Sequence, residues 1–330
     1  MRKKNIAATL VTVGSCIALL IIALQSAPAA EPLHILIGVP PGGSLDRLAR
    51  TLGEGYRQQT GQPVVVESKV GANSIIAARA CKAAEPDGLT ICLLGNDTVS
   101  VKPLLYENLG YEPLQDFAPI TNVVISQGVV IIKKSLPVNT FQEFVKYSKD
   151  HPGTLNYGSL GIGGVSYFLA EWLKQVSGAD LTHIPYGGGA PALLAYERGD
   201  IDLIYLVASP EIIARIKDGR AKAILVLGDK RNPYIPDVPT ITEAGLPRYD
   251  LPLYYGLFAP VATPKPIVDK LNGEFVKVIR SKFFYDRALK EPGYETALES
   301  TPTEFRKFLE KDRVVNQELL VRLGMKKLKL

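Results

Sequence analysis

The sequence predicts a two-lobed α/β protein in which each lobe is a mostly parallel β-sheet flanked by helices. Three observations support this. Short apolar strands alternate with amphipathic helices along most of the chain, which is typical of helix-covered parallel sheets. The length of 330 residues exceeds what one hydrophobic core usually organises. No long flexible linker interrupts the pattern, so we expect short strands that cross between the lobes.

Residues 1–29 are predicted to be a cleaved secretory signal peptide. Three positive charges lie in residues 1–4, and an apolar run covers residues 17–24. Ala27-Pro28-Ala29 places small residues at the two positions that signal peptidase recognises, so we expect cleavage after Ala29 and export. An uncleaved anchor stays open, because a span needs only about 20 apolar residues. Lipidation of Cys16 also stays open, because the residues before it loosely resemble a lipobox.

The charge balance argues against nucleic acid as a partner. The whole chain carries a formal charge of +5, and loss of Arg2, Lys3 and Lys4 would leave +2. Binding to a phosphate backbone needs a larger basic excess. After residue 29 the sequence has no second apolar stretch long enough to span a membrane.

Cysteines and histidines show no pattern of a metal site. Cys81 and Cys92 are expected in the core of lobe one, on a helix and the strand after it, and could form a disulfide in an oxidising compartment or stay as two buried free thiols. His34, His151 and His183 have no ligand spacing. We therefore expect neither a metal nor a cofactor.

The elements of lobe one are predicted in two parts of the chain. Buried apolar runs predict strands at 34–39, 64–67, 89–94 and 254–260, with helices from about residue 44 and over 73–84. Pro264 opens a long helix, and Thr301-Pro302-Thr303-Glu304 caps a final helix that stops at Gly324. Lobe one is accordingly assigned to 30–121 plus 249–330.

Lobe two is assigned to 122–248, where the alternation repeats. Thr140 is the expected N-cap of a helix from Phe141, with Glu143 in capping-box position. Gly199 and Gly219 are expected to close two helices. The predicted strands are 129–132, 155–157, 181–185, 201–207 and 221–227, and the further helices are 166–176, 190–198 and 211–218.

Three glycine-rich loops run from the end of a strand to the start of a helix: 40–46, 156–164 and 185–191. Uncovered backbone N–H groups and a helix N-terminus suit an anion. A tight turn with Ser44 as N-cap and Asp46 countering the helix dipole is the alternative for the first loop. Because ligands of open α/β sheets lie outside the carboxyl ends of strands, loops from both lobes could face one cleft.

Catalytic groups do not stand out. A base-activated nucleophile and the Gly-x-Ser-x-Gly pattern are absent from the sequence. Asp46 and Asp97 follow strands, but duties at a helix start and in a loop explain them more simply. His183 is interpreted as a core histidine.

Eight dispersed segments together resemble the periplasmic receptors of tripartite tricarboxylate transporters, the Bug family, between about Leu33 and Gly324. They are PPGGSLDRLAR, TGQPVVVE, PDGLTICLLG, PGTLNYGS, HIPYGGGAPALL, GDIDLI, PDVPTITEAGLP and APVATPKPIVDKLN. The resemblance implies the type II periplasmic-binding-protein (venus-flytrap) fold, a periplasmic location, and no enzymatic activity. It also implies a monomer that binds a small organic carboxylate and delivers it to membrane permease subunits.

The family's ligand-binding loops map onto this sequence residue by residue. In the family they hold a carboxylate largely through backbone groups and ordered waters. The residues implied here are Gly42, Gly43, Ser44 and Asp46 from lobe one, and Gly158, Ser159, Gly161, Gly163, Tyr186, Gly187, Ala190 and Pro191 from lobe two.

Three departures from the family pattern lie where ligand specificity is usually set. Tyr167 stands where many members have histidine, Gly188 extends a loop that more often reads PYKG, and Tyr205-Leu206-Val207 replaces Phe-Asp-Asn. These changes predict a less polar pocket and a larger, aromatic or monocarboxylic ligand. A secreted enzyme acting on a carboxylated substrate and a sensor that signals to a membrane kinase remain alternatives.

Overall fold

The structure is a computed structural model that describes residues 30–161, 164–186, 188–249, 253–290, 294–296, 300–325 and 327–329. It divides into two compact units, Met1–Glu31 and Pro32–Leu330. The predicted signal peptide, its cleavage site and Cys16 lie outside the described residues. Within the described ranges no helix has the length and apolar character of a membrane span. The following description concerns the second unit.

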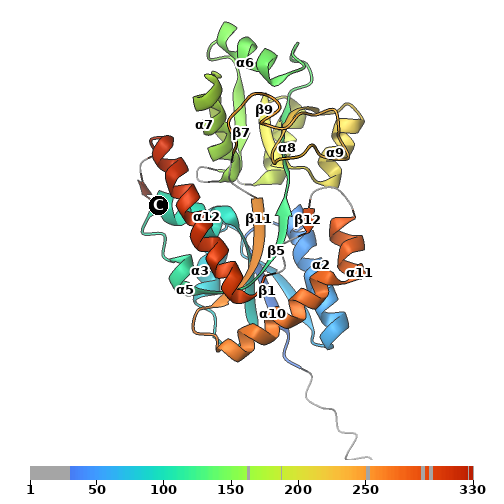
Figure 1. Cartoon of the computed structure of the whole chain (residues 1–330), viewed down its shortest axis with the longest axis vertical. Helices are drawn as coiled ribbons and strands as arrows, with labels where there is room; N and C mark the ends of the chain where they lie inside the picture. The colour runs from blue at the N-terminus through green and yellow to red at the C-terminus, as the bar shows by residue number, and fades with distance from the viewer. Residues whose placement is uncertain are drawn as a thin grey trace, which may run out of the picture. The chain divides into compact units, whose positions relative to one another are not determined.

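A six-stranded sheet, in the order β12-β5-β11-β3-β1-β2, forms the centre of what we call lobe one (Figure 1). β1 pairs in parallel with β2 and β3, whereas β11 and β12 pair antiparallel to their neighbours. The predicted parallel pairing is thus correct for β1, β2 and β3. It is wrong for β11 and β12, which come from later in the chain. The strands are β1 (Leu33–Ile37), β2 (Val64–Ser68), β3 (Thr90–Gly95), β5 (Phe117–Ser126), β11 (Leu253–Pro260) and β12 (Tyr294–Thr296).

Helices cover both faces of this sheet because neighbouring strand residues point to opposite faces. Ile35 packs with Leu52 and Phe275, beneath α2 (Ser44–Thr60) and α10 (Lys265–Arg280). Leu36, the next residue, packs on the other side with helices α3 (Ile75–Lys82) and α12 (Pro302–Arg322). The shorter elements are η1 (Asp97–Val101), α4 (Lys102–Leu105), β4 (Tyr106–Glu107), α5 (Pro113–Asp116), α11 (Lys282–Phe284), η2 (Tyr285–Leu289) and β13 (Leu328–Lys329).

A five-stranded sheet, in the order β10-β6-β9-β7-β8, forms the centre of what we call lobe two. β7 pairs in parallel with β8 and β9, and β6 runs antiparallel to β9 and β10. Two buried clusters lie on its faces. The elements are β6 (Gly128–Ile132), β7 (Asn156–Ser159), β8 (Thr182–Pro185), β9 (Leu203–Val207), β10 (Lys222–Val226), α6 (Phe141–Asp150), α7 (Val165–Ser177), α8 (Gly189–Arg198) and α9 (Pro210–Lys217).

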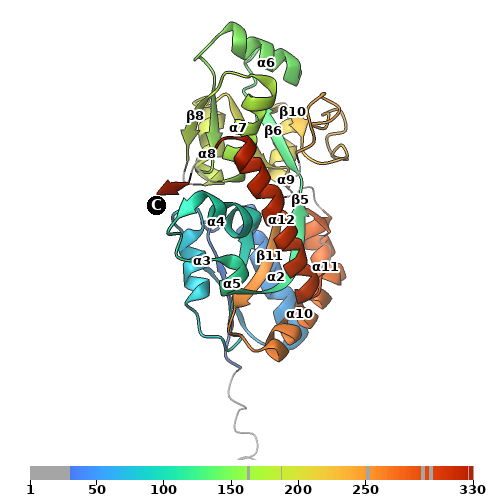
Figure 2. The same ribbon diagram turned by 60° about the vertical axis from the view of Figure 1, so that its left-hand side comes forward.

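Two elements connect the sheets. β5 ends in lobe one at Ser126, and β6 begins in lobe two at Gly128, so a single residue separates them. α12 contributes Phe305 to a core cluster of lobe one and Leu319 to a cluster of lobe two, along the path visible in Figure 2. The two connections described here are therefore the segment that joins β5 to β6 and the long helix α12. The lobe boundaries in sequence stay a prediction.

Several helix ends, and the burial of both cysteines, agree with the predictions from the sequence. Thr140 accepts a hydrogen bond from the backbone N–H of Glu143, and Thr301 with Glu304 forms a complete capping box. Cys81 on α3 and Cys92 on β3 are fully buried, as expected, and are joined by a disulfide with 6.1 Å between their Cα atoms. The free-thiol alternative is therefore wrong, because helix and strand bring the two side chains face to face in one core.

Candidate functional site

The first glycine-rich loop leaves the start of α2 open. Gly43 is the N-cap, and no side chain accepts a hydrogen bond there, so the alternative in which Ser44 caps the helix is wrong. Ser44 is instead the first helical residue. A Cβ built on Gly42 or Gly43 would meet nothing within 4 Å. The start of this 17-residue helix therefore has no side-chain cap, and the helix dipole there favours an anion.

Asp46 holds this loop in shape. Its side chain is 3% exposed and accepts hydrogen bonds from the backbone N–H of Gly42, at 2.9 Å, and from Nε of Arg50, at 3.0 Å. Burial raises the pKa of Asp46, but the hydrogen bonds from Arg50 and Gly42 outweigh it and hold the pKa below its ordinary value. An ionised Asp46 would repel a bound carboxylate, so its contribution to the site is to position the loop.

The second loop is fixed by Ser159 at the end of β7. Ser159 is fully buried, and its Oγ lies 2.7 Å from Nε2 of His183 on β8 and accepts the N–H of Gly161. The rings of Tyr157 and Tyr167 pack against the His183 ring, at centroid distances of 4.9 and 4.8 Å. Burial lowers the pKa of His183 and so favours the neutral imidazole.

The Ser159–His183 pair is the arrangement in the described residues that most resembles a nucleophile with its base. A nucleophile must reach a substrate, and Ser159 has no exposed surface. Its hydroxyl is also engaged by the Gly161 N–H. The pair is therefore a hydrogen-bonded contact between β7 and β8. His183 has a partner, as expected, but it lies half-buried on the edge strand β8 and is not a core residue.

The remaining predicted residues of lobe two have different roles. A Cβ on Gly158 would lie 2.4 Å from Cδ1 of Ile201, so this glycine makes room for packing. Tyr186 donates its backbone N–H to the Ser159 carbonyl, and Pro191 lies exposed in the first turn of α8. Gly163, Gly187 and the side chain of Ala190 lie outside the described residues.

Two contacts join the lobes near these loops. Arg47, on the first turn of α2, forms an ion pair with Glu211, on the first turn of α9, at 2.5 Å. Nδ2 of Asn73, in the loop before α3, lies 3.9 Å from where a Cβ on Gly161 would stand. These contacts place α2 near α9 and the residues before α3 near Gly161, and the common cleft of the three glycine-rich loops stays a prediction.

Sequence reasoning missed three residues near this edge of the sheets. Asn73 Nδ2, both side-chain polar atoms of Asn96 and Ser126 Oγ are buried without a hydrogen-bond partner among the described residues. Asn96 is 1% exposed and directly follows β3. A single sequence carries no signal for such atoms, because their lack of partners arises from tertiary packing.

One departure from the family pattern, at Tyr205, lies in the core, and another, Tyr167, is half-buried on the first turn of α7. Tyr205 is 4% exposed and covers Gly128, where a Cβ would lie 2.0 Å from the Tyr205 ring. Tyr167 packs on His183. Gly188 is the N-cap of α8 with a φ of +154°, which favours glycine. The expectation of a less polar pocket therefore rests mainly on the half-buried Leu206 and Val207.

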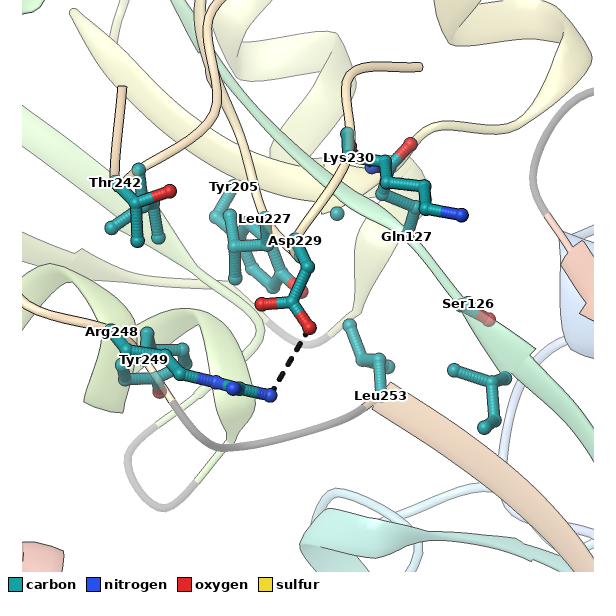
Figure 3. Close-up of a pocket in the computed structure, with 14 residues that line it drawn as sticks. Ser126, Gln127, Tyr205, Leu227, Asp229, Lys230, Thr242, Arg248, Tyr249 and Leu253 are labelled. Atoms are coloured by element: carbon teal, nitrogen blue, oxygen red, sulfur yellow. Dashed lines mark hydrogen bonds and ion pairs between the residues drawn. The ribbon is translucent and has the colours of Figure 1, made fainter. Parts of the chain in front are cut away.

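A separate cavity of about 420 Å³ lies where the chain crosses between the sheets (Figure 3). Its lining includes Ser126, Gln127 and Gly128 from the crossing segment and the ion-paired Arg248 and Asp229. Its lining includes none of the predicted ligand-binding residues. We therefore treat it as a feature of the crossing segments and not as the candidate site.

Comparisons with known proteins agree with this architecture. The model of the tripartite tricarboxylate transporter family receptor, TctC, matches residues 48–324. A UPF0065 protein of Bordetella pertussis is 36% identical over 259 residues, covering 77% of this chain and 79% of that protein.

Solved structures of the same kind align over most of the chain. The periplasmic binding protein BugD has a TM-score of 0.82 at 31% identity, covering 90% of this chain and 99% of its own. MatC of Rhodopseudomonas palustris with bound malate has a TM-score of 0.81 at 28% identity, covering 89% and 100%. R. palustris Rpa4515 with adipate has a TM-score of 0.83 at 25% identity, covering 92% and 100%. The chain has the two-lobed fold of periplasmic binding proteins, and it belongs to the Bug family of tripartite tricarboxylate transporter receptors.

Proposed function

We propose that this chain is a periplasmic receptor that binds a small organic carboxylate between its lobes and delivers it to the membrane subunits of a tripartite tricarboxylate-type transporter. The observation that carries the proposal is the open start of α2. No side chain caps the helix, a Cβ on Gly42 or Gly43 would meet nothing within 4 Å, and Arg47 pairs with Glu211 on α9 of lobe two. A carboxylate in that space would meet backbone donors and a favourable dipole.

The ligand class is supported by the relatives. MatC binds malate and Rpa4515 binds adipate, two small dicarboxylates carried by proteins of the same fold. The anion loops proposed for this chain are those around Gly43, Ser44, Gly161 and Tyr186. Delivery to a permease follows from the transporter family whose receptor model the chain matches.

A receptor that performs no reaction agrees with the chemistry of the loops. In the pair that comes closest to a catalytic arrangement, the serine is fully buried and hydrogen-bonds to a half-buried histidine. The disulfide between Cys81 and Cys92 supports export, because such bonds persist in oxidising compartments.

The proposal is tested by calorimetry of the purified mature protein with malate, adipate, citrate and benzoate. Saturable binding of at least one of these anions is expected, with the anion recovered unchanged after prolonged incubation. Failure of all four to bind would contradict the carboxylate class. Conversion of a bound anion to a new product would instead favour the enzyme alternative.

A further inference from the structure

Another cavity, of about 350 Å³, lies where α2 and α11 meet the edge of the lobe-one sheet at β2. α11 lies beside α2 (Figure 1), and the structure describes all three elements without a gap. The charged residues of its described lining are Arg50, Arg57, Arg287 and Glu54. We call this cavity the arginine pocket. Three arginines beside one carboxylate suit a partner that carries several negative charges.

The arginines of the pocket have unused donors. Arg50 binds Asp46 through Nε and Nη2. Arg57 binds Glu54 through the same two atoms, so Nη1 of both arginines has no acceptor among the described residues. Arg287 is exposed and forms no ion pair within the described ranges. Because a guanidinium has five N–H donors, a carboxylate that enters the pocket can bind without breaking the existing pairs.

β2 presents a free edge of the sheet beside this pocket. It is the last strand in the sheet order, and of the described strands it pairs only with β1. The N–H of Lys69 and the carbonyl of Pro63 bond to β1. Because backbone groups point alternately to the two sides of a strand, those of Val64, Val66 and Ser68 point away from β1. Such unpaired groups can accept another strand.

The two faces of this edge differ in chemistry. Val64 and Val66 line the arginine pocket. Val65 points to the opposite face and is 41% exposed. Glu67 shares that face, but its charge is already paired with Lys69, at 2.8 Å. A strand added to this edge would therefore place alternate side chains against arginines on one face and beside an exposed valine on the other.

We propose that the free edge of β2 and the arginine pocket form a docking surface for an extended, acidic segment of a partner protein. The segment adds to β2 as a strand, pairs its carboxylates with the three arginines and lays its intervening apolar side chains beside Val65. The inference goes beyond carboxylate binding, and it rests on the proposed function only in assigning the segment to a membrane subunit. A second copy of this chain fits poorly, because a symmetric contact brings the same arginines together.

Peptides of matched composition test this by fluorescence anisotropy with the mature protein. The probe is a labelled peptide of alternating glutamate and valine, capped at both ends, so that a strand carries all its carboxylates on one face. The first control has the same residues in the repeat Glu-Glu-Val-Val, which puts carboxylates on both faces. The second control is the alternating peptide N-methylated throughout, which cannot donate to a strand edge.

The protein variants are Arg287→Glu, which reverses the charge, and Arg287→Gln, which only removes it. Arg287 is exposed, so both variants should fold, and thermal unfolding checks this. Arg198→Glu is the matched control, because Arg198 is an exposed arginine at the last turn of α8 in lobe two. It changes the net charge by the same amount as Arg287→Glu.

At low salt we expect the alternating peptide to bind at least about tenfold more tightly than either control peptide, because each hydrogen bond to a charged group corresponds to about tenfold or more in affinity. Arg287→Glu should weaken binding of the alternating peptide by at least the same factor, and Arg287→Gln by a smaller one. Arg198→Glu should bind as the unsubstituted protein does. Binding should weaken as the salt concentration rises.

Absence of binding by the alternating peptide, or equal binding of all three peptides, would overturn the proposal. The arginines would then only protect an exposed edge from pairing. Unaltered binding by Arg287→Glu would also overturn it. Displacement of the peptide by phosphate, at concentrations too low to screen charge, would make the pocket a small-anion site instead. No carboxylate ligand enters this measurement, so failure of the docking surface and failure of the proposed carboxylate binding are seen separately.

Discussion

Arg47 on α2 and Glu211 on α9 form an ion pair between the two lobes, with 2.5 Å between Nη1 and Oε1. Burial raises the pKa of Glu211, but hydrogen bonds from Ser209 and the backbone, together with Arg47, bring it below its ordinary value. The pair lies on the first turns of two helices that start at glycine-rich or strand-end loops.

We expect Arg47→Ala to weaken ligand binding only a few fold. Both side chains are more than 40% exposed, and exposed pairs contribute about 0–1 kcal/mol after solvent screening. Calorimetry at low and high salt should show that the loss shrinks as salt rises. Arg57→Ala, which breaks an exposed pair within α2 alone, is the control. A hundredfold loss for Arg47→Ala would mean that Arg47 contacts the ligand directly and that a conventional arginine clamp replaces the backbone site.

Asp46 should make stability depend on pH. Its pKa is lowered in the folded protein, so its contribution is present above the unfolded value of about 3.9 and is lost as the pH falls through the folded value. Asp46→Asn should destabilise the protein by about 1.5–3 kcal/mol at neutral pH, because charge-assisted hydrogen bonds are lost. Denaturant unfolding between pH 7 and pH 3 should then show a shallower acid decline for the variant. Parallel pH curves for the two proteins would rule this out.

Removal of the disulfide should cost about 2–4 kcal/mol, since it closes a short loop of sequence separation 11 in the unfolded chain. The measurement is thermal unfolding of the double variant Cys81→Ala/Cys92→Ala beside the unsubstituted protein, each with and without dithiothreitol. The reductant should lower the unfolding temperature of the unsubstituted protein alone. An equal response from both proteins would show that the bond contributes nothing.

Gly128→Ala should destabilise the crossing between the sheets. Its Cβ would lie 2.0 Å from Cε2 of Tyr205, so the buried ring must shift to make room. Overpacking of this kind typically costs about 1–3 kcal/mol. The double variant Gly128→Ala/Tyr205→Leu should recover part of the loss in denaturant unfolding. If the double variant recovered no stability, the destabilisation would come from the backbone of Gly128 and not from the contact with Tyr205.

Most strands and helices of the fold could be predicted from the sequence because their apolar periodicity and caps are local. β5 could not, although its ten residues make it the longest strand described. It contains Pro119, Thr121 and Asn122, and its pairing with β11 shifts register twice, so it shows no regular alternation. Thr121 and Asn122 are nevertheless buried there, among residues distant in sequence. One of these is Ser300, whose hydroxyl accepts a hydrogen bond from the Asn122 N–H.

Some features of the candidate site could likewise be predicted from the sequence, and others could not. Glycines between a strand and a helix are readable in the sequence, and they pointed to the loops around Gly43 and Gly161. The role of Asp46 as the residue that orients its own loop, and the direction of Asn73, depend on dihedral angles and contacts that composition does not carry. Gly158 was readable as a loop glycine but serves packing against Ile201.

Gly43→Val tests most directly whether backbone groups at the start of α2 bind the ligand. Gly43 has an ordinary φ of −82° and open space around it, so valine fits without strain, whereas Gly161, at +119°, would be strained by any side chain. Gly273→Val on α10, also in open space, is the matched control. Calorimetry with a carboxylate that binds the unsubstituted protein should show binding abolished in Gly43→Val and retained in Gly273→Val. Normal binding by a folded Gly43→Val protein would contradict the account.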